Sequence, residues 1–233
     1  MKNLEKVKTK IKKQIRPVIK RELRHLLHPF WQPFYSQAGE DKLIYKVIGR
    51  KPNGFYIDVG AWCPDRLSNT YFFYQLGWAG LCIEPNPDLI DQFQIVRPRD
   101  KVLNIAVSNF EGEANFFTSQ STVFNSLSPR ANIHESKLVV KVRRLESILD
   151  EIQAPKTIDF ISIDTEGTEI DVLEGLNLEK YRPRLILVEY NTDKVINTKL
   201  QPYLISQGYS IIYISHCNII ASSDFERDAL LLG

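Results

Sequence analysis

The stretch that decides the fold is Gly54–Ala61, with the sequence GFYIDVGA; Glu84 closes a second apolar run, LCIEP, 24 residues after Gly60. Both runs are short, apolar and followed by acidic residues, as expected of buried strands in a parallel sheet. Ligands of such sheets bind beyond the carboxyl ends of the strands. Glu84 is therefore placed to accept hydrogen bonds from the hydroxyls of a ribose.

The residues after Gly60 indicate which nucleoside would bind. A dinucleotide site requires G-x-G-x-x-G, because the second glycine lets the backbone approach a pyrophosphate and the third allows close helix packing. In this chain Trp62 and Asp65 occupy those two positions. They argue against NAD and FAD, whereas S-adenosylmethionine carries a ribose and no phosphate. The pattern predicts a site for S-adenosylmethionine; a plain strand-to-helix turn is the alternative.

Charge is distributed unevenly along the 233 residues. Residues 1–24 hold ten Lys or Arg and two Glu, a net +8, so the remainder carries −6 of the total +2. The three cysteines are widely spaced, which argues against a disulfide framework and a zinc site and favours a reducing cytoplasm. No apolar run has the length of a secretory signal or a membrane span. We expect a cytoplasmic protein, soluble or peripheral at a membrane surface.

Residues 1–28 repeat apolar side chains at spacings of three and four among Lys and Arg, which predicts a basic amphipathic helix. Such a helix can lie on an anionic membrane, or pack on its own domain or on a second subunit of a homo-oligomer. Nucleic-acid binding is disfavoured, because the rest of the chain is acidic and lacks a recognised motif. We expect this helix and an aromatic, proline-rich linker in 1–35, and one catalytic domain in 36–233.

From residue 36 the chain alternates strands and helices, which predicts an α/β fold with a mostly parallel sheet. Its last two strands, Tyr209–Ile214 and Asn218–Ala221, are joined by a short turn and should form an antiparallel hairpin, as is typical of class I methyltransferases. Residues 109–143 interrupt the alternation and are expected to form a hairpin or lid. Further strands are predicted at Ala79–Glu84, Lys101–Val107, Ile158–Ile163 and Leu185–Tyr190.

Five motifs in sequence order resemble the FkbM family of S-adenosylmethionine-dependent methyltransferases over residues 36–221. They are SQAGED at 36–41, YIDVGA at 56–61, IEPNP at 83–87, NIAVS at 104–108 and FISIDTEGTE at 160–169. The resemblance implies a Rossmann-like sheet and methyl transfer to a hydroxyl, often of a sugar or natural product. One departure is Trp62-Cys63-Pro64, where the family commonly has Asn and Gly. Asn69 and Thr70 are candidates to supply the polar contacts of that loop.

Methyl transfer to an alcohol needs positioning and a group that accepts the hydroxyl proton. Asp164 is the first candidate for that group because it ends an apolar strand; capping of the next helix is its alternative role. Glu166 and Glu189 are further catalytic candidates, and His134 would be a base carried by a closing lid. Donor-binding candidates lie at the same strand ends: Asp58, Gly60, Ala61, Asn69, Thr70, Glu84, Asn86, Ala106, Ser108 and Asp164.

We therefore expect an S-adenosylmethionine-dependent O-methyltransferase acting on a hydroxyl of a sugar, glycan or natural product. Asp164, Glu166 and Glu189 are oxygen ligands that Mg²⁺ would accept, but the same acids serve without it, so no metal is predicted. The alternatives are an oxidoreductase that binds NAD or a nucleotide sugar, and a non-catalytic scaffold that reaches a membrane through residues 1–28. The identity of the acceptor stays open.

Overall fold

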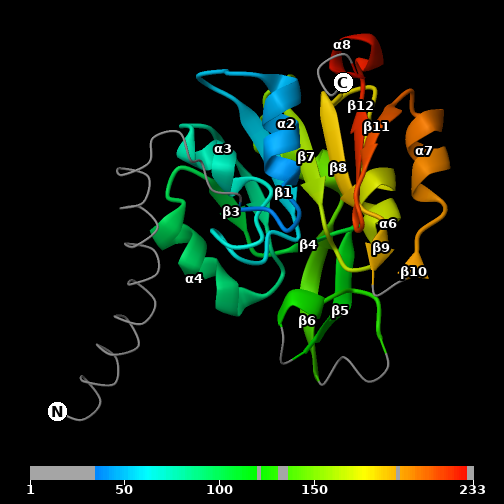
Figure 1. The fold of residues 1–233 in the computed structure, drawn as a ribbon. Coiled ribbons are helices and arrows are strands. Elements are labelled where there is room, and N and C mark those ends of the chain that lie inside the picture. The colour runs from blue at the N-terminus through cyan, green and yellow to red at the C-terminus, as the bar shows by residue number, and fades with distance from the viewer. Residues whose placement is uncertain (1–34, 120–121, 131–135, 193–194, 230–233) are drawn as a thin grey trace. The chain divides into compact units, whose positions relative to one another are not determined.

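A seven-stranded sheet forms the centre of the computed structural model, which describes residues 35–119, 122–130, 136–192 and 195–229 (Figure 1). Its strands are β1 Phe55–Val59, β2 Ala79–Ile83, β3 Lys101–Leu103, β7 Phe160–Ile163, β8 Leu185–Glu189, β11 Ser210–Ile214 and β12 Asn218–Ser222. They lie in the order β11-β12-β8-β7-β1-β2-β3. All pairs are parallel except those of β12, which runs antiparallel to both β11 and β8. The sheet confirms the predicted Rossmann-like class I methyltransferase fold, including its antiparallel C-terminal hairpin.

Helices cover both faces of this sheet because successive strand residues point to opposite sides. On one face, Ile57 and its neighbours pack with α5 Leu145–Glu151, α6 Glu169–Glu174 and α7 Leu200–Ser206. On the other face, Tyr56 and Phe160 pack with α2 Glu40–Ile48, α3 Tyr71–Gln75 and α4 Pro87–Val96. The sheet is therefore packed between two buried layers. The short helix α8 Phe225–Ala229 follows the last strand.

The strand register brings the acidic residues to one edge. Val59 pairs with Ile83 of β2 and Ile163 of β7, and Ile163 pairs with Val188 of β8. The residues that follow these four are therefore level with one another in the sheet. They are Gly60, Glu84, Asp164 and Glu189.

The insertion forms a second sheet. The prediction of one strand over Lys101–Val107 is wrong, because this segment is divided between the two sheets. Asn104 donates to the backbone oxygens of Glu84 and Pro85 at 2.9 Å each, and the chain leaves the large sheet there. Its continuation, β4 Ala106–Val107, pairs with β6 Ser136–Arg143, which also pairs with β5 Gly112–Thr118. The predicted hairpin is confirmed, with β4 as an added third strand (Figure 1).

Three short elements were not predicted: the 3-10 helix η1 Thr122–Phe124 and the strand pair β9 Asn191–Thr192 and β10 Val195–Ile196. The predicted helix of residues 1–28 and the candidate base His134 lie outside the described residues. Within the described part of the chain, no helix has the length and apolar character needed to span a membrane.

Candidate active site

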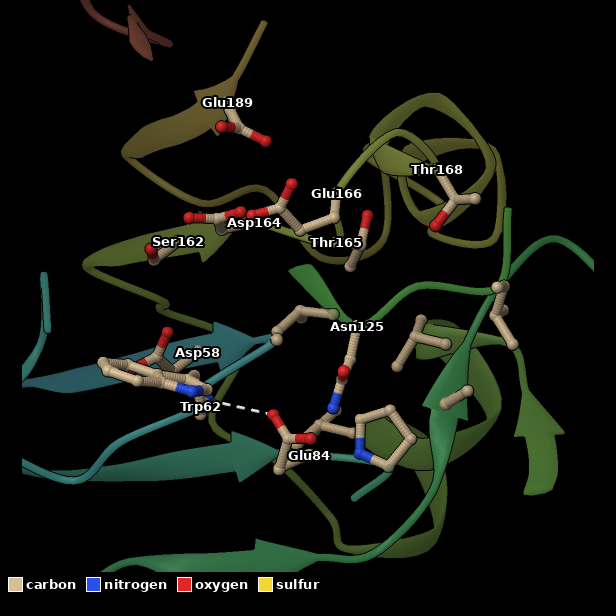
Figure 2. A pocket seen from close by; sticks show the side chains of 18 of the residues that line it. Asp58, Trp62, Glu84, Asn125, Ser162, Asp164, Thr165, Glu166, Thr168 and Glu189 are labelled. Carbon is tan, nitrogen blue, oxygen red and sulfur yellow. Dashed lines mark hydrogen bonds between the residues drawn. The ribbon is translucent and has the colours of Figure 1, made fainter. Parts of the chain in front are cut away.

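A cavity of about 280 Å³ opens at the carboxyl edge of the large sheet and is closed on one side by the insertion. Most of the predicted site residues line it: Asp58, Gly60, Ala61, Asn69, Glu84, Ala106, Asp164, Glu166 and Glu189. Figure 2 shows Asp164, Glu166 and Glu189 grouped at one end, and Glu84 with Trp62 at the other. The cavity thus has two acidic ends.

Three predicted donor-binding residues do not line this cavity. The Thr70 hydroxyl is fully buried, donates to Asp58 at 2.5 Å and accepts from Arg97 at 2.9 Å. The Asn86 side chain caps α4 by accepting from the backbone N–H of Asp88 at 3.0 Å. Ser108 is buried, and its backbone N–H donates to Arg143 of β6. These groups support the walls of the cavity from behind.

Glu84 is held by backbone donors from both sides. The N–H of Trp62 donates to Oε2 at 2.9 Å (Figure 2), and the N–H of Asn86 donates to Oε1 at 2.8 Å. Burial raises the pKa of Glu84 to about 7, although both N–H groups act in the opposite direction. The carboxyl group therefore changes charge near neutral pH, and its remaining acceptor capacity faces the cavity.

A buried arginine supports Asp58 and the turn after β1. Arg97 donates from Nε to Asp100 at 2.6 Å, and its Nη1 lies 3.9 Å from Asp58 Oδ2. Its Nη2 donates to the Tyr56 hydroxyl at 3.0 Å and to the Thr70 hydroxyl. Burial raises the pKa of Asp58, while Arg97 and Thr70 lower it. This network holds the Asp58 side chain in place. From the sequence, Asp58 was expected only to bind the methyl donor.

The chain segment after β7 requires a glycine at position 60. Its φ is +77°, and a Cβ at this position would lie 1.8 Å from the backbone oxygen of Asp164. That contact is far inside van der Waals distance, so a side chain would push β1 and the turn after β7 apart. The glycine keeps Asp164 close to the end of β1.

At the other end of the cavity, Asp164, Glu166 and Glu189 place carboxylate oxygens within 4.8 Å of one another. Burial raises the pKa of Asp164 well above its ordinary value, and the charges of Glu189, Glu166 and Glu169 raise it further. A hydrogen bond with Glu189 acts in the same direction. This pair therefore holds a proton at pH values where an exposed carboxylate would have lost it.

Glu166 and Glu169 have different surroundings, although both belong to the same sequence motif. Arg130 donates to Glu166 Oε2 at 2.6 Å, which neutralises Glu166 and fixes its direction. Glu169 is buried and accepts from the N–H groups of Thr165 at 3.2 Å and Gly167 at 2.8 Å. Glu169 therefore ties the turn together, and only Glu166 lines the cavity.

The three clustered acids are the one group among the described residues whose carboxylate geometry suits a metal ion. Mg²⁺ accepts such oxygen ligands. The ion pair between Arg130 and Glu166 already supplies positive charge to the cluster. A metal is thus not needed to balance the charge of Glu166.

Sequence reasoning missed several residues of the cavity wall. Gln37 is held there because Asp41 accepts from the Ser36 hydroxyl at 2.9 Å and from the Tyr35 N–H at 2.8 Å. Ser162 accepts from Asn69 at 3.0 Å, which links the loop after β1 to β7. Asn125, Thr165, Thr168 and Cys217 also line the cavity. The motifs at 36–41 and 160–169 contain four of these residues, Gln37, Ser162, Thr165 and Thr168, whereas no motif contains Asn125.

Comparison with protein families gives one match, the Methyltransferase FkbM domain, over residues 58–211. No curated protein matches the chain. Solved structures with a similar fold include a TehB-like S-adenosylmethionine-dependent methyltransferase from Corynebacterium glutamicum, at 10% identity and a TM-score of 0.44, covering 89% of this chain and 97% of that one.

Two further structures are similar at the same level. A methyltransferase from Geobacter sulfurreducens has 8% identity and a TM-score of 0.48, with 90% of this chain and 87% of that chain covered. The 1,6-didemethyltoxoflavin-N1-methyltransferase from Burkholderia thailandensis, solved with S-adenosylhomocysteine, has 11% identity and a TM-score of 0.43, with 80% and 78% covered. At these values none of the three structures bears on the acceptor.

Proposed function

Because the chain belongs to the FkbM family of methyltransferases, whose methyl donor is S-adenosyl-L-methionine, we propose that it methylates a hydroxyl group of a sugar, glycan or natural product. The observation that carries this proposal is the pair of neighbouring carboxyl groups of Asp164 and Glu189 at the wall of the cavity, since an attacking hydroxyl has to lose its proton. Membership of this family sets aside the oxidoreductase and scaffold alternatives.

In the proposed reaction the bound donor would supply a sulfonium methyl group; as the acceptor oxygen bonds to that methyl carbon, the carbon–sulfur bond breaks and the thioether leaves. Glu84 accepts hydrogen bonds from the ribose hydroxyls. Asp164 accepts the proton of the acceptor hydroxyl, and its raised pKa makes it a stronger base than an exposed aspartate. Glu189 keeps the pKa of Asp164 raised. Glu166, which Arg130 holds in place, orients the acceptor.

The charge of the cavity wall narrows the class of acceptor. Five carboxylates line the cavity, and none of its described lining residues is Lys, Arg or His. A phosphate or carboxylate close to the reacting hydroxyl would meet like charges, and Arg130 beside the cluster is already paired with Glu166 and does not line the cavity. Thr165, Thr168 and Gln37 offer neutral hydrogen-bonding groups instead. An uncharged polyhydroxyl acceptor fits this surface.

The proposal is tested by incubating the protein with methyl-labelled donor and matched panels of neutral glycosides, the corresponding sugar phosphates, and sugar acids. We expect label in the neutral glycosides, stable to mild alkali as a methyl ether is and a methyl ester is not. Transfer only to phosphorylated, carboxylated or amine acceptors would contradict it. A heat-denatured sample and reactions without acceptor serve as controls.

We propose in addition that residues 1–28 bind the protein to anionic membrane surfaces that face the cytoplasm, because these residues combine a net positive charge with a periodic apolar pattern. Flotation with vesicles containing anionic lipid should retain the full chain at low salt and release it at high salt. Vesicles of neutral lipid are the control. Failure to float at low salt would favour packing on the domain itself or in a homo-oligomer.

A further inference from the structure

The segment Thr122–Leu127 of the insertion, called the strap, is fastened to both ends of the cavity. At one end the Trp62 indole N–H donates to the Thr122 hydroxyl at 2.9 Å. At the other, the Ser126 hydroxyl donates to the backbone oxygens of Thr165 at 3.1 Å and Glu166 at 2.9 Å. The strap therefore has a fixed position relative to the loops after β1 and β7.

Asn125, within the strap, has a buried amide nitrogen that finds no hydrogen-bond partner among the residues that the structure describes. Its side chain is 8% exposed and lines the cavity. The amide oxygen accepts from the Ser119 backbone N–H at 2.9 Å, which fixes the orientation of the amide group. Buried N–H groups in folded proteins are nearly always paired. A molecule in the cavity is the natural source of the missing acceptor.

The position of Asn125 indicates which molecule this is. In Figure 2 Asn125 lies between the cluster of Asp164 and the side of Glu84, with its amide nitrogen directed toward Glu84. Glu84 is the residue assigned to the ribose, so the adjoining atoms are those of a nucleoside. Adenine ring nitrogens and ribose oxygens both accept hydrogen bonds, as the Asn125 amide nitrogen requires.

We propose that Asn125 Nδ2 donates a hydrogen bond to the nucleoside part of the bound donor, so that the insertion is a wall of the donor site and not only a boundary of the acceptor site. The inference rests on the donor orientation proposed above, with the ribose at Glu84. It assigns a binding role to a residue outside the large sheet.

The test is calorimetric titration of the full chain with S-adenosylhomocysteine and with 5′-methylthioadenosine, which has the nucleoside but lacks the amino acid. Asn125→Ala removes the donor. Asn125→Asp keeps an oxygen for the Ser119 N–H but, when ionised, cannot donate. Both variants should bind both ligands about 10-fold more weakly, since each ligand carries the nucleoside. The half-buried Thr118 shares a hydrogen bond with the Ser136 hydroxyl and does not line the cavity, so Thr118→Ala should not change either Kd.

Unchanged affinity in both Asn125 variants, or a loss seen only with S-adenosylhomocysteine, would overturn the proposal. Ser126→Ala cuts the strap's bonds to Thr165 and Glu166 while keeping the amide. If Ser126→Ala weakens the binding of both ligands as much as Asn125→Asp does, the position of the strap explains the effect rather than the hydrogen bond from Asn125, and the proposal fails. Wild-type protein that binds neither ligand would contradict the donor assignment itself, a result distinct from wild-type binding that the variants leave unchanged.

Discussion

Asp164→Asn should lower kcat by about 10²- to 10⁴-fold, the usual contribution of a positioned proton acceptor. Asparagine keeps the size and hydrogen-bonding capacity of the side chain but cannot accept the hydroxyl proton. The carboxyl group lies beside Glu189, and its raised pKa would be lost with it. The Kd of S-adenosylhomocysteine should change much less, because binding needs no proton transfer. Single-turnover kinetics and calorimetry measure the two quantities separately.

The companion variant Glu189→Gln distinguishes a base from a purely structural acid. Removing the neighbouring charge should lower the pKa of Asp164, so the acid limb of the kcat profile should move to lower pH. Glu179→Gln, which changes an exposed acid outside the cavity, is the matched control. A kcat for Asp164→Asn close to that of wild type, or an acid limb that Glu189→Gln leaves in place, would contradict the role of Asp164.

The acids at the sheet edge were predictable because strand register and strand ends are local properties of the sequence. Each apolar run ends just before its acid, and parallel pairing then places Glu84, Asp164 and Glu189 at one edge. The direction of each side chain was less accessible. Thr70 follows Asn69 directly, yet Asn69 lines the cavity and Thr70 turns to Asp58 and Arg97 behind it.

Contacts across long sequence separations account for the rest. The strand predicted at Lys101–Val107 ends early because Asn104 bonds the backbone after β2, a preference that no local pattern records. Asn125 reaches the cavity because its neighbours Thr122 and Ser126 bond to Trp62 and to the turn after β7. In the sequence it is one polar residue among many in a polar loop. Its proposed role follows from the amide nitrogen, which has no hydrogen-bond partner in the described part of the chain.

Glu84→Gln should weaken the binding of S-adenosylhomocysteine by about 100-fold and remove its dependence on pH. In the wild type, ribose hydroxyls would donate to the ionised carboxylate, and such charge-assisted bonds are roughly twice as strong as neutral ones. Because the pKa of Glu84 lies at about 7 without ligand, binding should release a proton, and the Kd should fall as pH rises from 6 to 8. Titrations in two buffers of different ionisation enthalpy measure that proton.

The same substitution should remove the part of the pH dependence of stability that Glu84 causes in the ligand-free protein. The pKa of Glu84 is higher in the folded chain, about 7, than the 4.5 of a free glutamate, so folding retains its proton. The contribution of Glu84 to stability is therefore greatest below pH 4.5 and is lost as the pH rises through 7, by at most about 3 kcal/mol. Glutamine carries no charge to bury, so the unfolding free energy of Glu84→Gln should lack this decline. A parallel decline in both proteins, or ligand binding that survives the substitution, would mean that Glu84 does not hold the donor as an ionised carboxylate.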